Sequence, residues 1–285
     1  MKIEIPKILS PMIDVVFKLL FGTEGNKELL MDFLQAVLNI SADELEDIII
    51  ANPFLLQEYK GDKLGILDVK LKLKTGKVIN IEVQIEPMPF MESRVLFYIS
   101  KLITEQINES DHYETIKPVI SIIITGHSLI KQSEKYHHYF GLYDIESGIL
   151  LTDILGIHTL EVLKARKINE HTEKTDLLNW MKFFDAKTEE ELNMLAEKSP
   201  TMKKASLRLL ELSTDEKARQ LYEARLKEQR DRYARERGVE KIAEKNAMLT
   251  VAKNALQKNM SIDDILDITT GLSYDEIEAM QNMDY

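Results

Sequence analysis

Residues 65–85, GILDVKLKLKTGKVINIEVQI, contain the pattern from which the architecture follows. Apolar and polar side chains alternate with a period of two on both sides of Thr75-Gly76. Alternation of this kind, interrupted by a short segment containing glycine, predicts two strands joined as a β-hairpin. The apolar positions are Leu67, Val69, Leu71, Leu73, Ile79, Ile81, Val83 and Ile85.

The register of this hairpin follows from the same pattern, because a slip of one residue would move every apolar side chain to the other face. A three-residue loop, Lys74-Thr75-Gly76, keeps the faces matched, with Gly76 in the left-handed conformation that such loops use. We therefore expect Leu71 opposite Ile79 and Val69 opposite Ile81.

The predicted register also sets Asp68 opposite Glu82, with Gln84 two residues further along the same face. Carboxylates that face each other across two strands repel, so this pair requires compensation. A divalent cation is one explanation, since Mg²⁺ takes oxygen ligands and is often held by one or two carboxylates. A solvated sheet face with Lys70 and Lys72 as ion-pair partners is the other.

Composition restricts the class of protein. The chain has 285 residues, of which 44% are hydrophobic and 30% charged, as expected for a globular protein of one or two domains. It has no cysteine, no apolar run long enough to span a membrane and no signal peptide, so we expect a cytoplasmic protein. A net charge of −11 argues against a broadly basic nucleic-acid-binding surface.

A helix is predicted for residues 11–21, beginning with Ser10 as the cap and Pro11 at the first position and ending at Gly22. It is apolar nearly all round, which indicates a buried helix. Its two charged residues, Asp14 and Lys18, are four apart. They form an ion pair at the helix edge, or Asp14 is an acid that the helix carries toward a site.

The remaining elements of this region predict a mixed β-sheet with helices packed on it. The run PVISIIIT at residues 118–125 is typical of a buried central strand. Residues 43–51 and 157–163 remain unassigned. The other predicted elements are helices over 26–38 and 91–108, and strands over 54–60, 139–143 and 150–154.

The predicted helix over residues 91–108 carries a polar stripe formed by Arg94, Tyr98, Lys101 and Glu105. A polar stripe is usually a solvated face. This one follows the two carboxylates closely in the chain, so Arg94 and Tyr98 are also candidates to point at the same site.

Beyond about residue 165 the sequence is helical. Residues 214–259 are highly charged and predict one long helix, with a break at Gly238 as an alternative. Arginines there alternate with acids, which favours a solvated helix or coiled coil over a DNA-binding arm. The tail, residues 261–280, resembles a helix-turn-helix in spacing but has no Lys or Arg, so we expect it to pack on protein. Shorter helices are predicted over 176–184, 189–197 and 202–212.

Other catalytic motifs are absent from the sequence. It contains no glycine-rich phosphate loop and no nucleophile elbow. The six histidines show no metal-ligand spacing, and the adjacent His137 and His138 point to opposite faces of a strand. We therefore expect no histidine-based site.

These motifs, taken in order, resemble a known family. Residues 10–22 follow the pattern S-P-x-x-D-x-x-F-K-x-L-F-G, and an aspartate on a strand, a short hairpin, I-E-V-Q and a helix containing Arg and Tyr come after it. The arrangement is similar to the recombination-promoting nuclease and putative transposase family of the PD-(D/E)XK nuclease superfamily. The stretches YDIESGILLTDILGIHTLEVLKA and DITTGLSYDEI are similar to later parts of that family.

The resemblance implies roles for individual residues. Asp68 matches the first metal-binding acid, Glu82 the second, and Asp14 the helix-borne acid of many members. The backbone carbonyl of Val83 would be a further metal ligand. Gln84 stands where the superfamily signature has lysine, which puts the efficiency of catalysis in doubt.

The resemblance also implies a fold, a division of the chain and an activity. We expect an α/β, restriction-endonuclease-like mixed sheet flanked by helices over residues 1–165, and a helical C-terminal region over residues 166–285. The activity is Mg²⁺-dependent endonucleolytic cleavage of DNA with low sequence specificity, with Mn²⁺ as an alternative metal. The C-terminal helices are a candidate surface for homo-oligomerisation, and no membrane partner is expected.

Three alternatives stay open at this point. Arg94 and Tyr98 contact the substrate phosphate, or Arg94 forms an ion pair with Glu82 or Asp68. The chain cleaves DNA, or it is a degenerate member that acts through protein contacts made by its long charged helix. The third alternative is that the substrate is RNA.

Overall fold

The computed structural model describes residues 7–46, 48–51, 68–168 and 174–283. The strand predicted over 54–60 lies outside these residues. The chain divides into two compact units, Met1–Glu223 and Ala224–Tyr285. The boundary expected at residue 165 falls inside the first unit, where helices beyond it pack on helices near the N-terminus.

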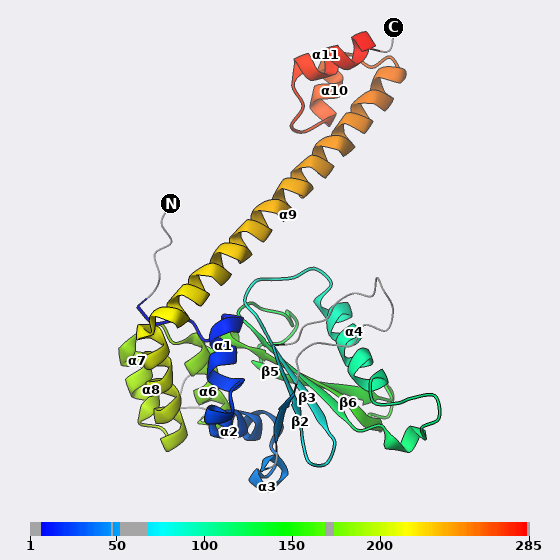
Figure 1. The fold of residues 1–285 in the computed structure, drawn as a ribbon. Helices are drawn as coiled ribbons and strands as arrows, with labels where there is room; N and C mark the ends of the chain where they lie inside the picture. The colour runs from blue at the N-terminus through cyan, green and yellow to red at the C-terminus, as the bar shows by residue number, and fades with distance from the viewer. Residues whose placement is uncertain (1–6, 47, 52–67, 169–173, 284–285) are drawn as a thin grey trace. The chain divides into compact units, whose positions relative to one another are not determined.

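A mixed β-sheet of six strands forms the centre of the first unit (Figure 1). Its order is β1-β2-β3-β4-β6-β5, with β3, β4 and β6 parallel and the remaining pairs antiparallel. The described strands are β1 (Ile49–Ala51), β2 (Val69–Lys72), β3 (Val78–Gln84), β4 (Val119–Thr125), β5 (His137–Tyr143) and β6 (Leu150–Glu161).

The hairpin register predicted from sequence is confirmed. Val69 pairs with Ile81 and Leu71 with Ile79. The loop is Lys74-Thr75-Gly76, with backbone hydrogen bonds closing it at Leu73, and Gly76 has a φ of 86°. A positive φ at the last loop position is the reason that glycine is required there.

Strand β4 is the buried central strand expected from its continuous apolar run. The neighbouring strand, β6, was predicted to end at residue 154, and this bound was wrong. It continues to Glu161 and so includes much of the segment left unassigned, residues 157–163. The reason lies in the pairing, since β6 hydrogen-bonds to β5 on one side and to β4 on the other. A strand paired on both edges continues where its local sequence is ambiguous.

Helices α1, α2, α6 and α8 form a core of the first unit around a cluster of large aromatic rings. Phe21 lies at the centre of this cluster, with ring centroids of Phe17, Phe33, Trp180 and Phe184 between 4.7 and 6.0 Å away. The bounds of the helices here are α1 (Asp14–Phe21), α2 (Lys27–Leu38), α5 (Val162–Ala165), α6 (Asp176–Asp185), α7 (Glu189–Ala196) and α8 (Pro200–Thr214).

The first helix begins three residues later than predicted. Ser10 and Pro11 form a turn before α1, in which the Ser10 hydroxyl accepts a hydrogen bond from the Met12 N–H at 3.3 Å. Ile13 is the capping residue and contributes no side-chain hydrogen bond. Asp14 is consequently the first residue of the helix rather than an interior one.

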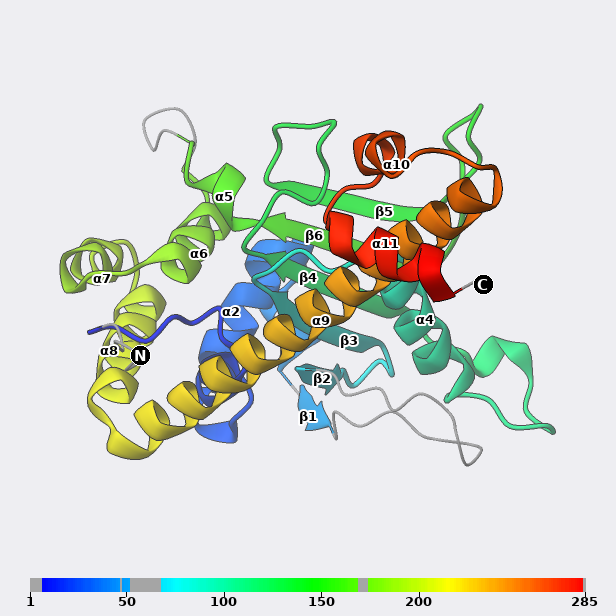
Figure 2. The same cartoon turned by 90° about the horizontal axis from the view of Figure 1, so that it is seen from above.

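Helix α4 (Met91–Thr104) covers one face of the sheet, as Figures 1 and 2 show. Val95, Ile99 and Leu102 pack there against strand residues that include Val78 and Ile123. Alternation along β3 then places Glu82 on this same face, because Glu82 is an even number of residues from Val78. The sheet face that α4 covers therefore carries polar side chains at the end of β3.

The second unit contains the end of one long helix and two short ones. Helix α9 (Glu216–Gln257) crosses the division between the units and continues through Gly238, so the alternative of a break there was wrong. Helices α10 (Ile262–Ile268) and α11 (Tyr274–Met283) bury Ile265 and Ile277 against Ala252 and Ala255. The remaining described helix is α3 (Ala42–Leu45), and no described helix is both long and apolar enough to cross a membrane.

Candidate active site

Four elements meet at the end of strand β3 nearest to Gln84. Asp68 immediately precedes β2, and continuation of the hairpin register places it opposite Glu82 on β3. Helix α1 begins nearby with Asp14, whose negative charge acts on Asp68. Helix α4 adds Arg94 over Glu82. The three acids proposed from sequence therefore share one electrostatic environment.

Asp68 is mostly withdrawn from water and is held by two contacts. One carboxylate oxygen accepts a hydrogen bond from the Val83 N–H at 2.9 Å, and the other lies 3.5 Å from the Lys18 ammonium. Burial raises the pKa of Asp68, and the charge of Asp14 raises it further. The Val83 N–H and Lys18 lower this pKa, but burial is the largest effect.

Glu82 is more deeply buried, with 6% of the residue exposed. Its carboxylate accepts a hydrogen bond from the Asn80 side chain at 3.2 Å and lies 3.9 Å from Arg94 Nε. Burial raises the pKa of Glu82, and the charge of Asp68 adds to the rise, whereas Arg94 and Asn80 oppose it. Two buried, like-charged carboxylates, which the continued hairpin register places opposite each other, thus lie at the end of β3.

The polar stripe of α4 faces the sheet rather than solvent, so the interpretation as a solvated face was wrong. Arg94 lies beside Glu82, and its guanidinium stands 5.0 Å from the centre of the Tyr98 ring. Tyr98 is buried under the helix at 4% exposure. Glu105 pairs with Lys70 at 3.0 Å, so the ion-pair partner of Lys70 is on α4 and is not one of the two candidate acids.

The backbone at Val83 faces the same place. The Val83 N–H and C=O point to the same side of a strand, which is the side of Asp68. The next carbonyl, of Gln84, points instead toward β4 and accepts from the Gly126 N–H at 2.9 Å. The Gln84 side chain donates to the Glu86 carbonyl at 2.7 Å.

The chemistry of these donors fits a hard divalent cation. The site offers two carboxylates and a backbone carbonyl, all oxygen ligands, which is the set that Mg²⁺ prefers. The raised pKa values of Asp68 and Glu82 indicate negative charge that the protein alone does not fully compensate. In the part of the chain described, no three His, Cys, Asp or Glu side chains group closely enough to hold a metal without other ligands.

Sequence reasoning overlooked two members of the site. Asn80 was treated only as part of the alternation, although the period of two places it on the same face as Glu82. Lys18 was considered only in relation to Asp14, and its ammonium lies 3.5 Å from Asp68. Helical spacing suggests only the local partner, because the strand that supplies Asp68 is fifty residues further along the chain.

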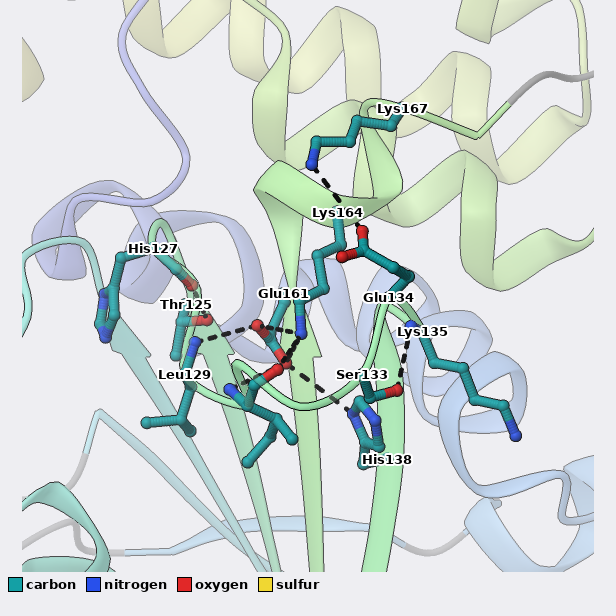
Figure 3. Close-up of polar contacts among 11 residues, drawn as sticks. Thr125, His127, Leu129, Ser133, Glu134, Lys135, His138, Glu161, Lys164 and Lys167 are labelled. Carbon is teal, nitrogen blue, oxygen red and sulfur yellow. Dashed lines mark hydrogen bonds and ion pairs between the residues drawn. The ribbon is translucent and has the colours of Figure 1, made fainter.

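A third buried carboxylate, Glu161 at the end of β6, has a different character (Figure 3). It accepts hydrogen bonds from the backbone N–H groups of Leu129 at 2.9 Å and Ile130 at 3.4 Å, and pairs with Lys164 at 2.8 Å. Its charge is therefore matched by protein donors. We assign this cluster to anchoring the segment between β4 and β5, not to catalysis.

From sequence, no histidine-based site was expected. His137 and His158 share a hydrogen bond of 2.9 Å between ring nitrogens on adjacent strands. Burial lowers the pKa of both, that of His158 to about 4, so the pair is neutral near pH 7. The expectation that these are ordinary core or surface residues stays a prediction.

The mixed sheet, the flanking helices and the acids at the end of β3 define a restriction-endonuclease-like fold of the PD-(D/E)XK class. A family model described as PD-(D/E)XK nuclease family transposase matches residues 11–237, and the chain belongs to this family. The family supports a nuclease or transposase-like function. Comparisons with curated proteins and with solved structures gave no match.

Proposed function

We propose that this protein is a metal-dependent endodeoxyribonuclease that hydrolyses DNA phosphodiester bonds with low sequence specificity. The observation that carries the proposal is the pair of buried carboxylates, Asp68 and Glu82, at the end of β3. Burial raises the pKa of both residues. Uncompensated buried carboxylates are costly for a fold, and their persistence at one edge favours a role in binding a cation.

In this proposal Asp68, Glu82 and the Val83 carbonyl hold Mg²⁺, with Mn²⁺ as a substitute. When bound, the ion lowers the pKa of water and stabilises charge on the scissile phosphate and the leaving oxygen. Asp14, the first residue of α1, is the third acid of the proposed catalytic site, and its negative charge raises the pKa of Asp68.

Residues beside the acids position the other groups. Gln84 orients water by hydrogen bonding but supplies no charge, unlike the lysine of the superfamily signature. Arg94 holds the Glu82 carboxylate from above and offers its remaining N–H donors to phosphate. Tyr98 is buried, so its proposed contribution to substrate binding is to hold the Arg94 guanidinium, which lies 5.0 Å from the centre of its ring.

The test is cleavage of supercoiled plasmid with Mg²⁺ or Mn²⁺ by the wild type and by Asp68→Ala and Glu82→Ala. We expect both variants to lose at least about two orders of magnitude in rate, because each removes a metal ligand. Asp153→Ala and Glu146→Ala, both exposed acids on the β5–β6 hairpin, are matched controls that keep full activity.

Equal cleavage by the wild type and both site variants would remove the proposed site. Parallel assays with double-stranded DNA, single-stranded DNA and RNA define the substrate. A folded wild type that binds neither metal in calorimetry would instead favour a non-cleaving member of the family that acts through protein contacts.

A further inference from the structure

Two positively charged side chains flank the candidate acids, and they come from different helices. Arg94 of α4 lies 3.9 Å from Glu82, and Lys18 of α1 lies 3.5 Å from Asp68. Lys70 is the other lysine on the hairpin face near the site, and its ammonium is 3.0 Å from Glu105. Lys18 is therefore the lysine that the described structure brings to the acid pair.

We propose that Lys18 is a catalytic residue that contacts the scissile phosphate, and that its ion pair with Asp68 is the substrate-free arrangement of the same ammonium. This inference rests on the proposed function. It assigns to a residue on α1 the positive charge that Gln84, a neutral side chain, does not supply.

The two positive side chains differ in how firmly they are held. Arg94 has Glu82 on one side, the Tyr98 ring 5.0 Å away and a hydrogen bond to the Met88 sulfur at 3.4 Å. These contacts hold the guanidinium over Glu82, although 32% of the Arg94 side chain is exposed. The Lys18 side chain is 37% exposed, so its ammonium reaches both Asp68 and the solvent from which a phosphate arrives.

The base of Lys18 is nevertheless rigid. Phe17 and Phe21 on the same helix are fully buried in the aromatic cluster, and they fix the helix axis. The fixed helix directs a flexible four-carbon stem with three rotatable donors toward the site. Such a side chain exchanges a carboxylate partner for a phosphate oxygen without movement of the backbone.

The exchange is favourable in electrostatic terms. Without substrate, Lys18 offsets part of the negative charge of Asp68. Where Asp68 and Glu82 held a divalent cation, that ion would supply their counter-charge, and the Lys18 ammonium would be released to meet a phosphate. The phosphate then offers Lys18 an anionic oxygen at the mouth of the site, where charge also develops during cleavage.

The experiment compares Lys18→Met and Lys18→Arg with the wild type in Mg²⁺-dependent plasmid cleavage. Lys18→Met is expected to lower kcat by about 10²–10³-fold with little change in KM, as for loss of one donor to a developing negative charge. Lys18→Arg keeps the charge and recovers part of kcat. Lys204→Met, which breaks an exposed ion pair with Glu28, is the matched control and keeps kcat.

A second measurement does not depend on cleavage. Binding of a short DNA duplex in Ca²⁺, followed by fluorescence anisotropy across a salt series, counts phosphate contacts. Loss of one contact in Lys18→Met lowers the slope of log K against log salt by about 0.9. Lys204→Met leaves the slope unchanged. Where Lys18→Met is too unstable to assay because Asp68 loses its partner, Lys18→Gln takes its place.

The outcomes separate the two proposals. A wild type without cleavage under any metal overturns the proposed function, and the salt slope then decides alone whether Lys18 meets phosphate. Lys18 variants that melt earlier but keep both kcat and slope show that the lysine only stabilises Asp68, and that result overturns the inference.

Discussion

The charged side chains of Asp68 and Glu82 destabilise the folded protein, and a bound cation would offset this effect. A carboxylate whose pKa is higher in the folded than in the unfolded protein stabilises the fold below its unfolded pKa, and this contribution is lost as pH rises through the folded value. Burial raises the pKa of both residues. Near pH 7, therefore, each charged carboxylate disfavours the folded state until a cation compensates it.

We predict that Glu82→Gln is at least as stable as the wild type in metal-free buffer near pH 7, since no charge is then buried at that position. Added Mg²⁺ should raise the melting temperature of the wild type but not of the variant. At a hundred times the dissociation constant the stabilisation is about 2.7 kcal/mol. Glu86→Gln, an exposed control nearby, should respond like the wild type, and a Glu82→Gln variant that also does so would contradict the assignment.

Metal affinity should also depend on pH beyond the range of ordinary carboxyl groups. Metal binding requires deprotonated ligands, and a raised pKa keeps Asp68 and Glu82 protonated to higher pH. Calorimetric titration of Mg²⁺ over an interval just above the ordinary carboxyl range should show affinity still rising with pH, with protons released on binding. Constant affinity over this interval would exclude these two acids as the ligands.

At the scale of elements, the sheet brings the site together. Strand β3 lies between the antiparallel partner β2 and the parallel partner β4, and β2 begins just after Asp68. The backbone groups at the end of β3 are thus left to bind side chains, as the Val83 N–H does with Asp68. Helices α1 and α4 then place Lys18 and Arg94 beside the two acids.

Strand β6 ends in the Glu161 cluster, which we predict to be structural (Figure 3). Glu161→Ala should lower the free energy of unfolding by about 3–5 kcal/mol, because it leaves Lys164 charged and buried without its carboxylate. Denaturant titration measures the effect. Glu134→Ala breaks only the exposed pair with Lys167 and should cost less than about 1 kcal/mol.

The double variant Glu161→Met/Lys164→Met distinguishes an ion-pair effect from a packing effect. It removes both charges, so it should recover most of the stability that Glu161→Ala loses. Equal losses in the single and double variants would mean that the hydrogen bonds to the Leu129 and Ile130 backbone, rather than the charge on Lys164, dominate.

At the scale of the whole molecule, the buried histidine pair should make the free energy of unfolding sensitive to mild acid. The pKa of His158 falls from 6.5 to about 4 through burial and the neighbouring His137. A lowered pKa means stability that is present above pH 6.5 and is lost as pH falls toward the folded value. The full contribution of this one group is about 3 kcal/mol.

We therefore expect the contribution of His158, taken as the difference in free energy of unfolding between the wild type and His158→Gln, to decrease from about pH 6.5 to about pH 4, whereas protonation of Asp68 and Glu82 acts in the opposite direction. His112→Gln, at an exposed position, should leave the curve of the wild type unchanged. Equal pH dependence of His158→Gln and the wild type would assign the decline to other groups.

The hairpin register, the central strand and the acid pair could be predicted from the sequence. Alternation in residues 65–85 predicted the register, the loop and the opposition of Asp68 and Glu82, because side chains in strands repeat every two residues and a buried face permits one register. The continuous apolar run of β4 predicted its central position for a similar reason. Both signals are local, so a single sequence suffices to recognise them.

Long-range packing settled the rest. Lys18 lies beside Asp68, Arg94 lies over Glu82, and β6 extends through an ambiguous segment because two strands pair with it. The partner of a charge or the length of a strand depends on residues far away in the chain. A pattern within one element determines which face a side chain occupies, and only packing between elements determines what it meets there.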